Sequence, residues 1–129
     1  MTKKAIQTSA APPPAGSYSQ AVSANGFLYT AGFGPQNPET GEVEVTSVGE
    51  QTRQVMRNLR SVLHEAGASF RDVVKVTVHL ADLHRDFKEF DAAYSEFVEA
   101  PFPVRTTVGS TLANILVEID VVAALPRDD

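Results

Sequence analysis

Hydrophobic positions between residues 47 and 67 recur every three to four residues, which predicts an amphipathic helix. The positions on this face are Val48, Thr52, Val55, Leu59, Val62, Leu63 and Ala66. Ser47 followed by Glu50 has the pattern of a capping box, and Gly67 supplies a stop. A second helix is expected to begin near Asp86, with one face formed by Phe87, Phe90, Tyr94 and Phe97.

Strict alternation of apolar and polar residues predicts a half-buried strand over residues 74–80. Residues 20–23 and 27–31 flank Asn25-Gly26, a pair that favours the tight turn of a hairpin. Residues 104–108 and 116–123 predict two final strands. The consecutive prolines before Gly16 fix an extended backbone, so they are expected to link a short N-terminal strand to the body.

The order of these elements predicts an α+β fold with both helices on one face of a single sheet. We treat residues 1–129 as one domain, with residues 1–16 as an N-terminal strand and proline-rich linker. The other face is expected to be a mixed surface that suits a subunit interface with polar pockets. Its predicted members are Lys75, Thr77, His79, Arg105, Thr107, Glu118 and Asp120.

Composition removes several classes of site. The chain has no cysteine, which excludes disulfides, thiol nucleophiles and thiolate metal ligands. His79 and His84 lack the companions of a metal site, so no metal is expected. There is no export signal and no run of the ~20 apolar residues that a membrane span needs, so we expect a cytoplasmic protein without a membrane partner.

The net charge of −5 disfavours a polyanionic partner. Arg53, Arg57, Arg60 and His64 form a basic stripe beside the apolar face of the first helix. A stripe of this kind is typical of a solvated helix face, and no interleaved aromatic platform is expected beside it. Nucleic acid is therefore not an expected partner.

Arg105 and Glu118 would lie directly opposite each other if the last two strands formed a hairpin. One interpretation is a structural ion pair across the hairpin. The other is an anion-binding arginine beside a carboxylate that orients water, because a planar guanidinium matches a carboxylate with two parallel hydrogen bonds. The residues alone leave both open.

Several segments resemble the Rid (YjgF) family in order and spacing. Residues 14–21 are similar to its P-x-G-x-Y-S-Q-A signature, and Ala31-Gly32 with residues 37–42 is similar to its S-G-Q…P-x-T-G-E segment. Further similarity covers the helix from Gln51 to Asn58-Leu59, the strand Val73–Val78, residues 102–106 (F-P-A-R-S/T in the family) and residues 117–120 (V-E-I-E).

The resemblance implies a chorismate-mutase-like fold and a homotrimer with sites in the clefts between subunits. It also implies hydrolysis of reactive 2-imino acids of the 2-aminoacrylate type to 2-keto acids and ammonia, without a cofactor. By position, Arg105 would bind the substrate carboxylate, and Glu118 would orient the attacking water. Tyr18 would form a hydrogen bond near the leaving nitrogen. The other implied substrate-binding residues are Ala31, Gly32, Phe87 (from the neighbouring subunit) and Thr107.

The chain departs from the family at three places. Ala31 and Thr107 stand where serine and cysteine are common, and the loop after Leu112 is shorter and lacks the usual proline. A second hypothesis is therefore a non-catalytic or regulatory protein that binds small carboxylates in the same cleft. A third is RNA cleavage or translation inhibition, which is an older label for some members.

Overall fold

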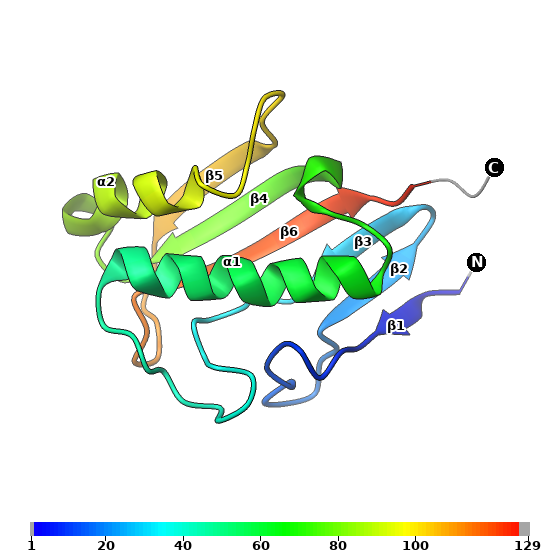
Figure 1. The fold of residues 1–129 in the computed structure, drawn as a ribbon, viewed down its shortest axis with the longest axis horizontal. Helices are drawn as coiled ribbons and strands as arrows, with labels where there is room; N and C mark the ends of the chain where they lie inside the picture. Colours follow the sequence, from blue (N-terminus) through cyan, green and yellow to red (C-terminus); the bar gives the residue numbers. More distant parts are fainter. Residues whose placement is uncertain (1, 127–129) are drawn as a thin grey trace.

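The computed structural model describes residues 2–126. Within them, six strands form one sheet in the order β1-β2-β3-β6-β4-β5. The strands are β1 (Lys4–Ile6), β2 (Ala21–Ala24), β3 (Phe27–Thr30), β4 (Val73–Leu80), β5 (Val104–Gly109) and β6 (Val117–Ala124). The helices α1 (Val48–Glu65) and α2 (Leu83–Tyr94) lie on the same face of the sheet (Figure 1). The predicted α+β arrangement is confirmed.

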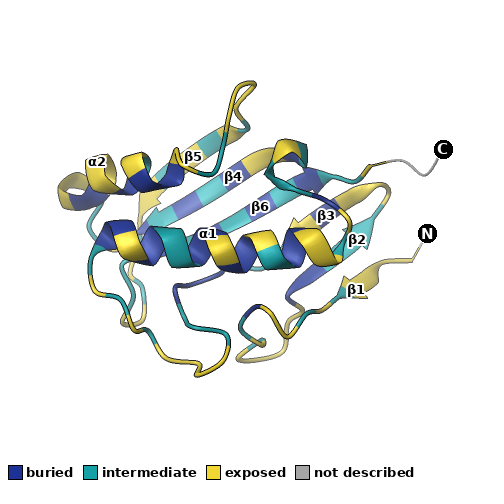
Figure 2. Cartoon of the chain, in the orientation of Figure 1, coloured by how far each residue is buried: buried dark blue, intermediate teal, exposed yellow. Residues whose placement is uncertain are grey.

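The boundaries of α1 follow its end signals. The Ser47 hydroxyl accepts a hydrogen bond from the backbone N–H of Glu50 at 3.1 Å, and Gly67 ends the helix with a φ of +78°. Buried and exposed positions alternate along the helix (Figure 2). The core lies between the helices and the sheet, and its fully buried side chains include Val55, Leu59, Leu28, Phe90 and Ile119.

The hairpin of β2 and β3 is also confirmed. Asn25 and Gly26 both have positive φ angles, +53° and +82°, which is the backbone of a two-residue type I′ turn. The strands pair from Ala24 opposite Phe27 to Ala21 opposite Thr30.

Helix α2 begins three residues before the predicted start near Asp86. Asp82 caps it, since its carboxylate accepts from the backbone N–H of Arg85 at 3.1 Å. Phe97 lies beyond the end of α2 and contacts Phe70 edge-on, with ring centroids 6.0 Å apart. The predicted aromatic face therefore contains Phe87, Phe90 and Tyr94 only.

The predicted hairpin of the last two strands is wrong. Strand β5 pairs in parallel with β4 at the edge of the sheet, while β6 lies between β3 and β4. The cause is α2, which crosses over between β4 and β5 and returns the chain in the same direction. Arg105 therefore lies opposite Val76, and Glu118 lies opposite His79.

This topology also corrects the composition of the open face. Arg105 and Thr107 pair with the buried Val76 and Val78, so they lie on the helix-covered face. The open face has Lys75, Thr77 and His79 from β4, Glu118, Asp120 and Val122 from β6, and Val104, Thr106 and Val108 from β5. It is more apolar at the β5 edge than predicted.

No helix within residues 2–126 is long and apolar enough to cross a membrane.

Candidate functional site

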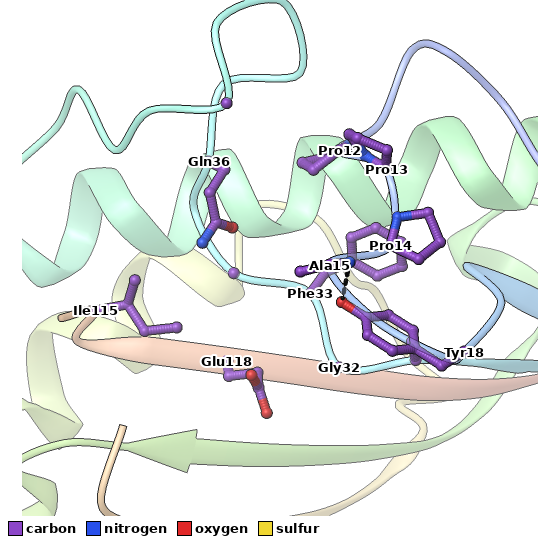
Figure 3. Close-up of a pocket in the computed structure, with 13 residues that line it drawn as sticks. Pro12, Pro13, Pro14, Ala15, Tyr18, Gly32, Phe33, Gln36, Ile115 and Glu118 are labelled. Atoms are coloured by element: carbon purple, nitrogen blue, oxygen red, sulfur yellow. Dashed lines mark hydrogen bonds between the residues drawn. The ribbon is translucent and has the colours of Figure 1, made fainter. Parts of the chain in front are cut away.

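A cavity of about 370 Å³ lies between the proline-rich segment, the loop after β3 and the start of β6 (Figure 3). Four residues expected to form the site line it together: Tyr18, Ala31, Gly32 and Glu118. The remaining walls come from Pro12, Pro13, Pro14, Ala15, Phe33, Gly34, Gln36, Gly41 and Ile115. Segments far apart in the sequence therefore meet around one carboxylate.

The proline-rich wall is fixed by Gln20, whose side chain is buried. Its carboxamide nitrogen donates to the carbonyl oxygens of Thr8 at 3.0 Å and Pro12 at 2.9 Å, and lies 3.3 Å from that of Ala11. Its oxygen accepts from the N–H of Thr8 at 2.7 Å. Prolines have no N–H to donate, so their backbone cannot pair as a strand does, and the side chain of Gln20 anchors the segment instead.

Tyr18 is half exposed at the mouth of the cavity. Its hydroxyl oxygen accepts from the N–H of Ala15 at 3.0 Å, an interaction visible in Figure 3. A phenol both accepts and donates, so its proton remains available to a bound molecule.

Gly32 and Glu118 approach so closely that a side chain at position 32 would collide with the carboxylate. A Cβ placed on Gly32 would lie 2.7 Å from Oε2 of Glu118. The neighbouring N–H groups of Ala31 and Phe33 bond to Gln20 and Ile119, at 2.9 and 2.8 Å. The backbone N–H of Gly32 has no partner within residues 2–126 and is available to a ligand.

Arg105 lies in a separate recess of about 380 Å³, with Asp91, Tyr94, Phe102 and Pro103 among its lining residues. Its Nη1 donates to Oδ1 of Asp91 at 2.7 Å. The guanidinium carbon also lies 4.9 to 5.6 Å from the ring centroids of Phe87, Phe90 and Tyr94. Three aromatic faces and one carboxylate thus hold the cation on α2.

Burial raises the pKa of the Tyr94 hydroxyl beside this cation, and the positive charge of Arg105 partly offsets the rise. Burial also raises the pKa of Asp120 on the open face, opposed by the nearby charges of His79 and Lys75. His79 Nδ1 lies 2.6 Å from the hydroxyl oxygen of Ser110.

The seven expected site residues therefore form two groups within one chain. The first is the cavity group, Tyr18, Ala31, Gly32 and Glu118; the second is the arginine group, Arg105, Phe87 and Thr107 on β5 and α2. The two recesses share no lining residue. The expected contact between Arg105 and Glu118 is not made within the chain.

Sequence reasoning missed Gln20, which anchors a wall of the cavity, and three residues that line the recesses, Asp91, Gln36 and Ile115. Gln20 was predicted at the start of a strand and in the family signature, but local spacing does not reveal that its side chain bonds back to Thr8 and Pro12. Asp91 was overlooked even though it is a charge inside an aromatic helix face, four residues after Phe87. Gln36 and Ile115 lie in loops. Loops have no periodic pattern from which the direction of a side chain could be predicted.

The basic stripe of α1 is partly neutralised. Arg53 forms a bidentate pair with Glu96, with a 2.8 Å contact from Nη2. Arg60 lies over the ring of Phe97 at 5.6 Å, so an aromatic residue does lie beside the stripe, contrary to expectation. Among the described residues, no group of three or more His, Cys, Asp or Glu side chains is arranged to hold a metal ion.

The sequence model of the family described as Endoribonuclease L-PSP matches residues 8–125. The chain belongs to this family, that of the Rid (YjgF) proteins. The RutC family protein slr0709 of Synechocystis is 47% identical, with 98% of this chain and 99% of that protein covered. Reactive Intermediate Deaminase A of Arabidopsis thaliana, a chloroplastic protein, is 39% identical over 95% of this chain and 66% of its own length.

The fold agrees with this membership. The crystal structure of E. coli TdcF with bound serine has a TM-score of 0.88 and 31% identity, covering 95% of this chain and 99% of TdcF. The expected YjgF-like fold is thereby confirmed.

Proposed function

We propose that this Rid protein is an imine/enamine deaminase that hydrolyses 2-imino acids to 2-keto acids and ammonia. The observation that carries the proposal is the pair of complementary half-sites: a carboxylate beside a free backbone N–H, and an arginine held in an aromatic recess. The active unit is a homotrimer in which the cavity group of one subunit faces the arginine group of its neighbour.

The open face of the sheet supports self-association. Within residues 2–126 both helices lie on the opposite face (Figure 1), and Val104 is 67% exposed on the open one. Phe87 and Phe102 expose large apolar surface around the recess of Arg105. Exposed apolar side chains of this kind are typical of interfaces, and a neighbouring subunit that covered Phe87 and Phe102 would exclude water from the recess of Arg105.

In the proposed reaction, Arg105 binds the substrate carboxylate through the part of its guanidinium not used by Asp91. Water adds to C2 of the iminium group, and Glu118 accepts the proton that the water releases. The C–N bond of the tetrahedral intermediate then breaks as its nitrogen takes up a proton. A 2-keto acid and ammonia result, so water is the only co-reactant.

Tyr18 and Gly32 orient the substrate in this scheme, by the phenol proton and the free N–H. An iminium carbon is already electrophilic, so positioning and modest proton transfer suffice. Two relatives support the choice of ligand: one is named a reactive intermediate deaminase, and TdcF holds serine, a small carboxylate. No cofactor takes part in this scheme, and the cytoplasmic location stays a prediction.

The test is ammonia release from imino acids generated in situ by an amino-acid oxidase, compared with uncatalysed hydrolysis. We expect faster release with the wild-type protein and near-background release with Glu118→Gln. A protein that binds keto acids without accelerating release would be a non-catalytic carboxylate binder. Cleavage of RNA that depends on Arg60 would favour the endoribonuclease alternative, which the net charge of −5 does not support.

A further inference from the structure

The carboxamide of Gln36 lies on the wall of the cavity that contains Glu118, and none of the proposed chemistry uses it. Figure 3 shows its side chain extending from the loop after β3 into the cavity, on the side of Ile115 and Glu118. Within the described residues, the amide oxygen and nitrogen of Gln36 have no hydrogen-bond partner. One acceptor oxygen and two N–H donors therefore remain for a ligand.

The loop that carries Gln36 is anchored. The buried Asn58 on α1 donates from Nδ2 to the carbonyl oxygens of Gly34 at 3.0 Å and Gln36 at 2.9 Å. Its own oxygen accepts from Gln54 at 2.9 Å, so the anchoring amide is fully engaged. The backbone at position 36 is thereby fixed relative to α1.

The carboxamide itself rests on Gly34. A Cβ at position 34 would lie 2.6 Å from Oε1 and 3.1 Å from Nε2 of Gln36. The absence of a side chain at Gly34 therefore leaves the space that the carboxamide of Gln36 occupies. Because the backbone that carries this carboxamide is fixed, less conformational freedom is lost when the carboxamide binds a ligand.

We infer that Gln36 determines specificity by forming a hydrogen bond with a neutral polar substrate side chain, such as a carboxamide or hydroxyl. This inference rests on the proposed function. A substrate whose C2 lies at Glu118 extends its side chain past Ile115 toward Gln36. An acidic side chain is disfavoured, because the cavity lining within the chain includes Glu118 and no lysine or arginine, and in the proposed site the neighbour's Arg105 is occupied by the substrate carboxylate.

The experiment compares imino acids made from glutamine and methionine, whose side chains have similar lengths. The measured quantity is the ratio of their kcat/KM values for ammonia release. Gln36→Met keeps the length of the side chain and removes its hydrogen bonds. We expect the glutamine-to-methionine ratio to fall roughly 5- to 10-fold, which corresponds to one neutral hydrogen bond. Gln7→Met, an exposed position outside this cavity, should leave the ratio unchanged.

A second variant tests orientation separately. Gly34→Ala keeps the carboxamide of Gln36 but shifts its position. The glutamine-to-methionine ratio of kcat/KM should therefore fall as it does in Gln36→Met. The double variant should be no worse than either single one, because both remove the same interaction. An unchanged ratio in Gln36→Met would overturn the inference.

Equilibrium binding separates this inference from the proposed function. The keto acids corresponding to glutamine and methionine should show the same preference, and Gln36→Met should abolish it. If ammonia release stays at background while this binding preference depends on Gln36, the deaminase proposal fails and the specificity inference stands. If release is fast and neither preference depends on Gln36, only the specificity inference fails.

Discussion

Arg105 on β5 and Asp91 on α2 are joined by a 2.7 Å hydrogen bond from Nη1 to Oδ1. The bond connects the guanidinium of Arg105, the expected carboxylate-binding group, to α2, which is the helix between β4 and β5. Only one of the two terminal nitrogens is used, so the guanidinium is oriented without being saturated. The pair is partly exposed, with side chains 22% and 47% accessible, so its contribution to folding stability is small.

This relationship predicts a binding defect in Asp91→Ala. Loss of the tether lets the guanidinium reorient, so KM for imino acids should rise roughly 5- to 20-fold while kcat changes less than about twofold. Steady-state kinetics measure both. Glu96→Ala, which breaks the comparable pair with Arg53 on the outer surface, should change neither constant. A fall in kcat at constant KM would contradict a positioning role for Asp91.

The contact between Gly32 and Glu118 predicts a catalytic defect in Gly32→Ala. The added methyl group would displace the carboxylate, since Cβ would lie 2.7 Å from Oε2. We expect kcat to fall at least about tenfold, part of the ~100-fold or more that a positioned acid–base group contributes, with little change in melting temperature. Gly16→Ala is the matched control, because its Cβ would contact Tyr18 at an ordinary 3.8 Å. Full activity in Gly32→Ala would remove Glu118 from the mechanism.

Local patterns predicted the elements well. Ser47, Asn25-Gly26 and Gly67 each act through their own backbone, so a single sequence contains their signal. The position of β6 in the sheet depends instead on the crossover through α2. This is a long-range feature, and the sequences of the last two strands do not reveal it. That one error placed Arg105 opposite Glu118 and on the wrong face.

The resemblance to the Rid family named residues that the structure divides between two recesses. Hydrophobic periodicity cannot predict this division, because the division depends on which face of β5 carries Arg105. Supporting residues such as Asp91 and Gln36 escaped notice because their roles come from tertiary contacts rather than from local spacing.

Asp120 predicts a pH-dependent effect on stability. Burial raises its pKa above the ordinary value of 3.8, so the folded state favours the protonated carboxyl. Its unfavourable contribution is absent at a pH below the ordinary pKa, develops as the pH rises from the ordinary to the raised pKa, and is complete above the raised pKa. Asp120→Asn should therefore melt a few degrees higher at neutral pH, with the difference shrinking near pH 3. Thermal melts across this range measure it, and a lower melting temperature at neutral pH would contradict the stated cause.

The proposed assembly predicts that Val104→Asp dissociates the protein. A carboxylate at this exposed position on the open face would lose its hydration when a trimer forms, even with Lys75 beside it, whereas in a monomer it would remain in water. Sedimentation should show a wild-type trimer at micromolar concentration and a folded monomer for the variant, with ammonia release near background. A wild-type monomer would refute the shared site.

The central claim is that one site combines Arg105 of one subunit with Glu118 of another, and mixed trimers test it directly. Arg105→Lys and Glu118→Gln are each expected to lose most activity, because lysine lacks the planar fork and glutamine cannot accept a proton. The two variants are mixed in equal amounts, unfolded and refolded together. In the resulting random trimers, one shared site in four has an intact Arg105 from one subunit and an intact Glu118 from its neighbour. We predict recovery of about a quarter of the wild-type rate of ammonia release. Recovery no greater than the sum of the two separate variants, with random mixing verified by mass spectrometry, would contradict the account.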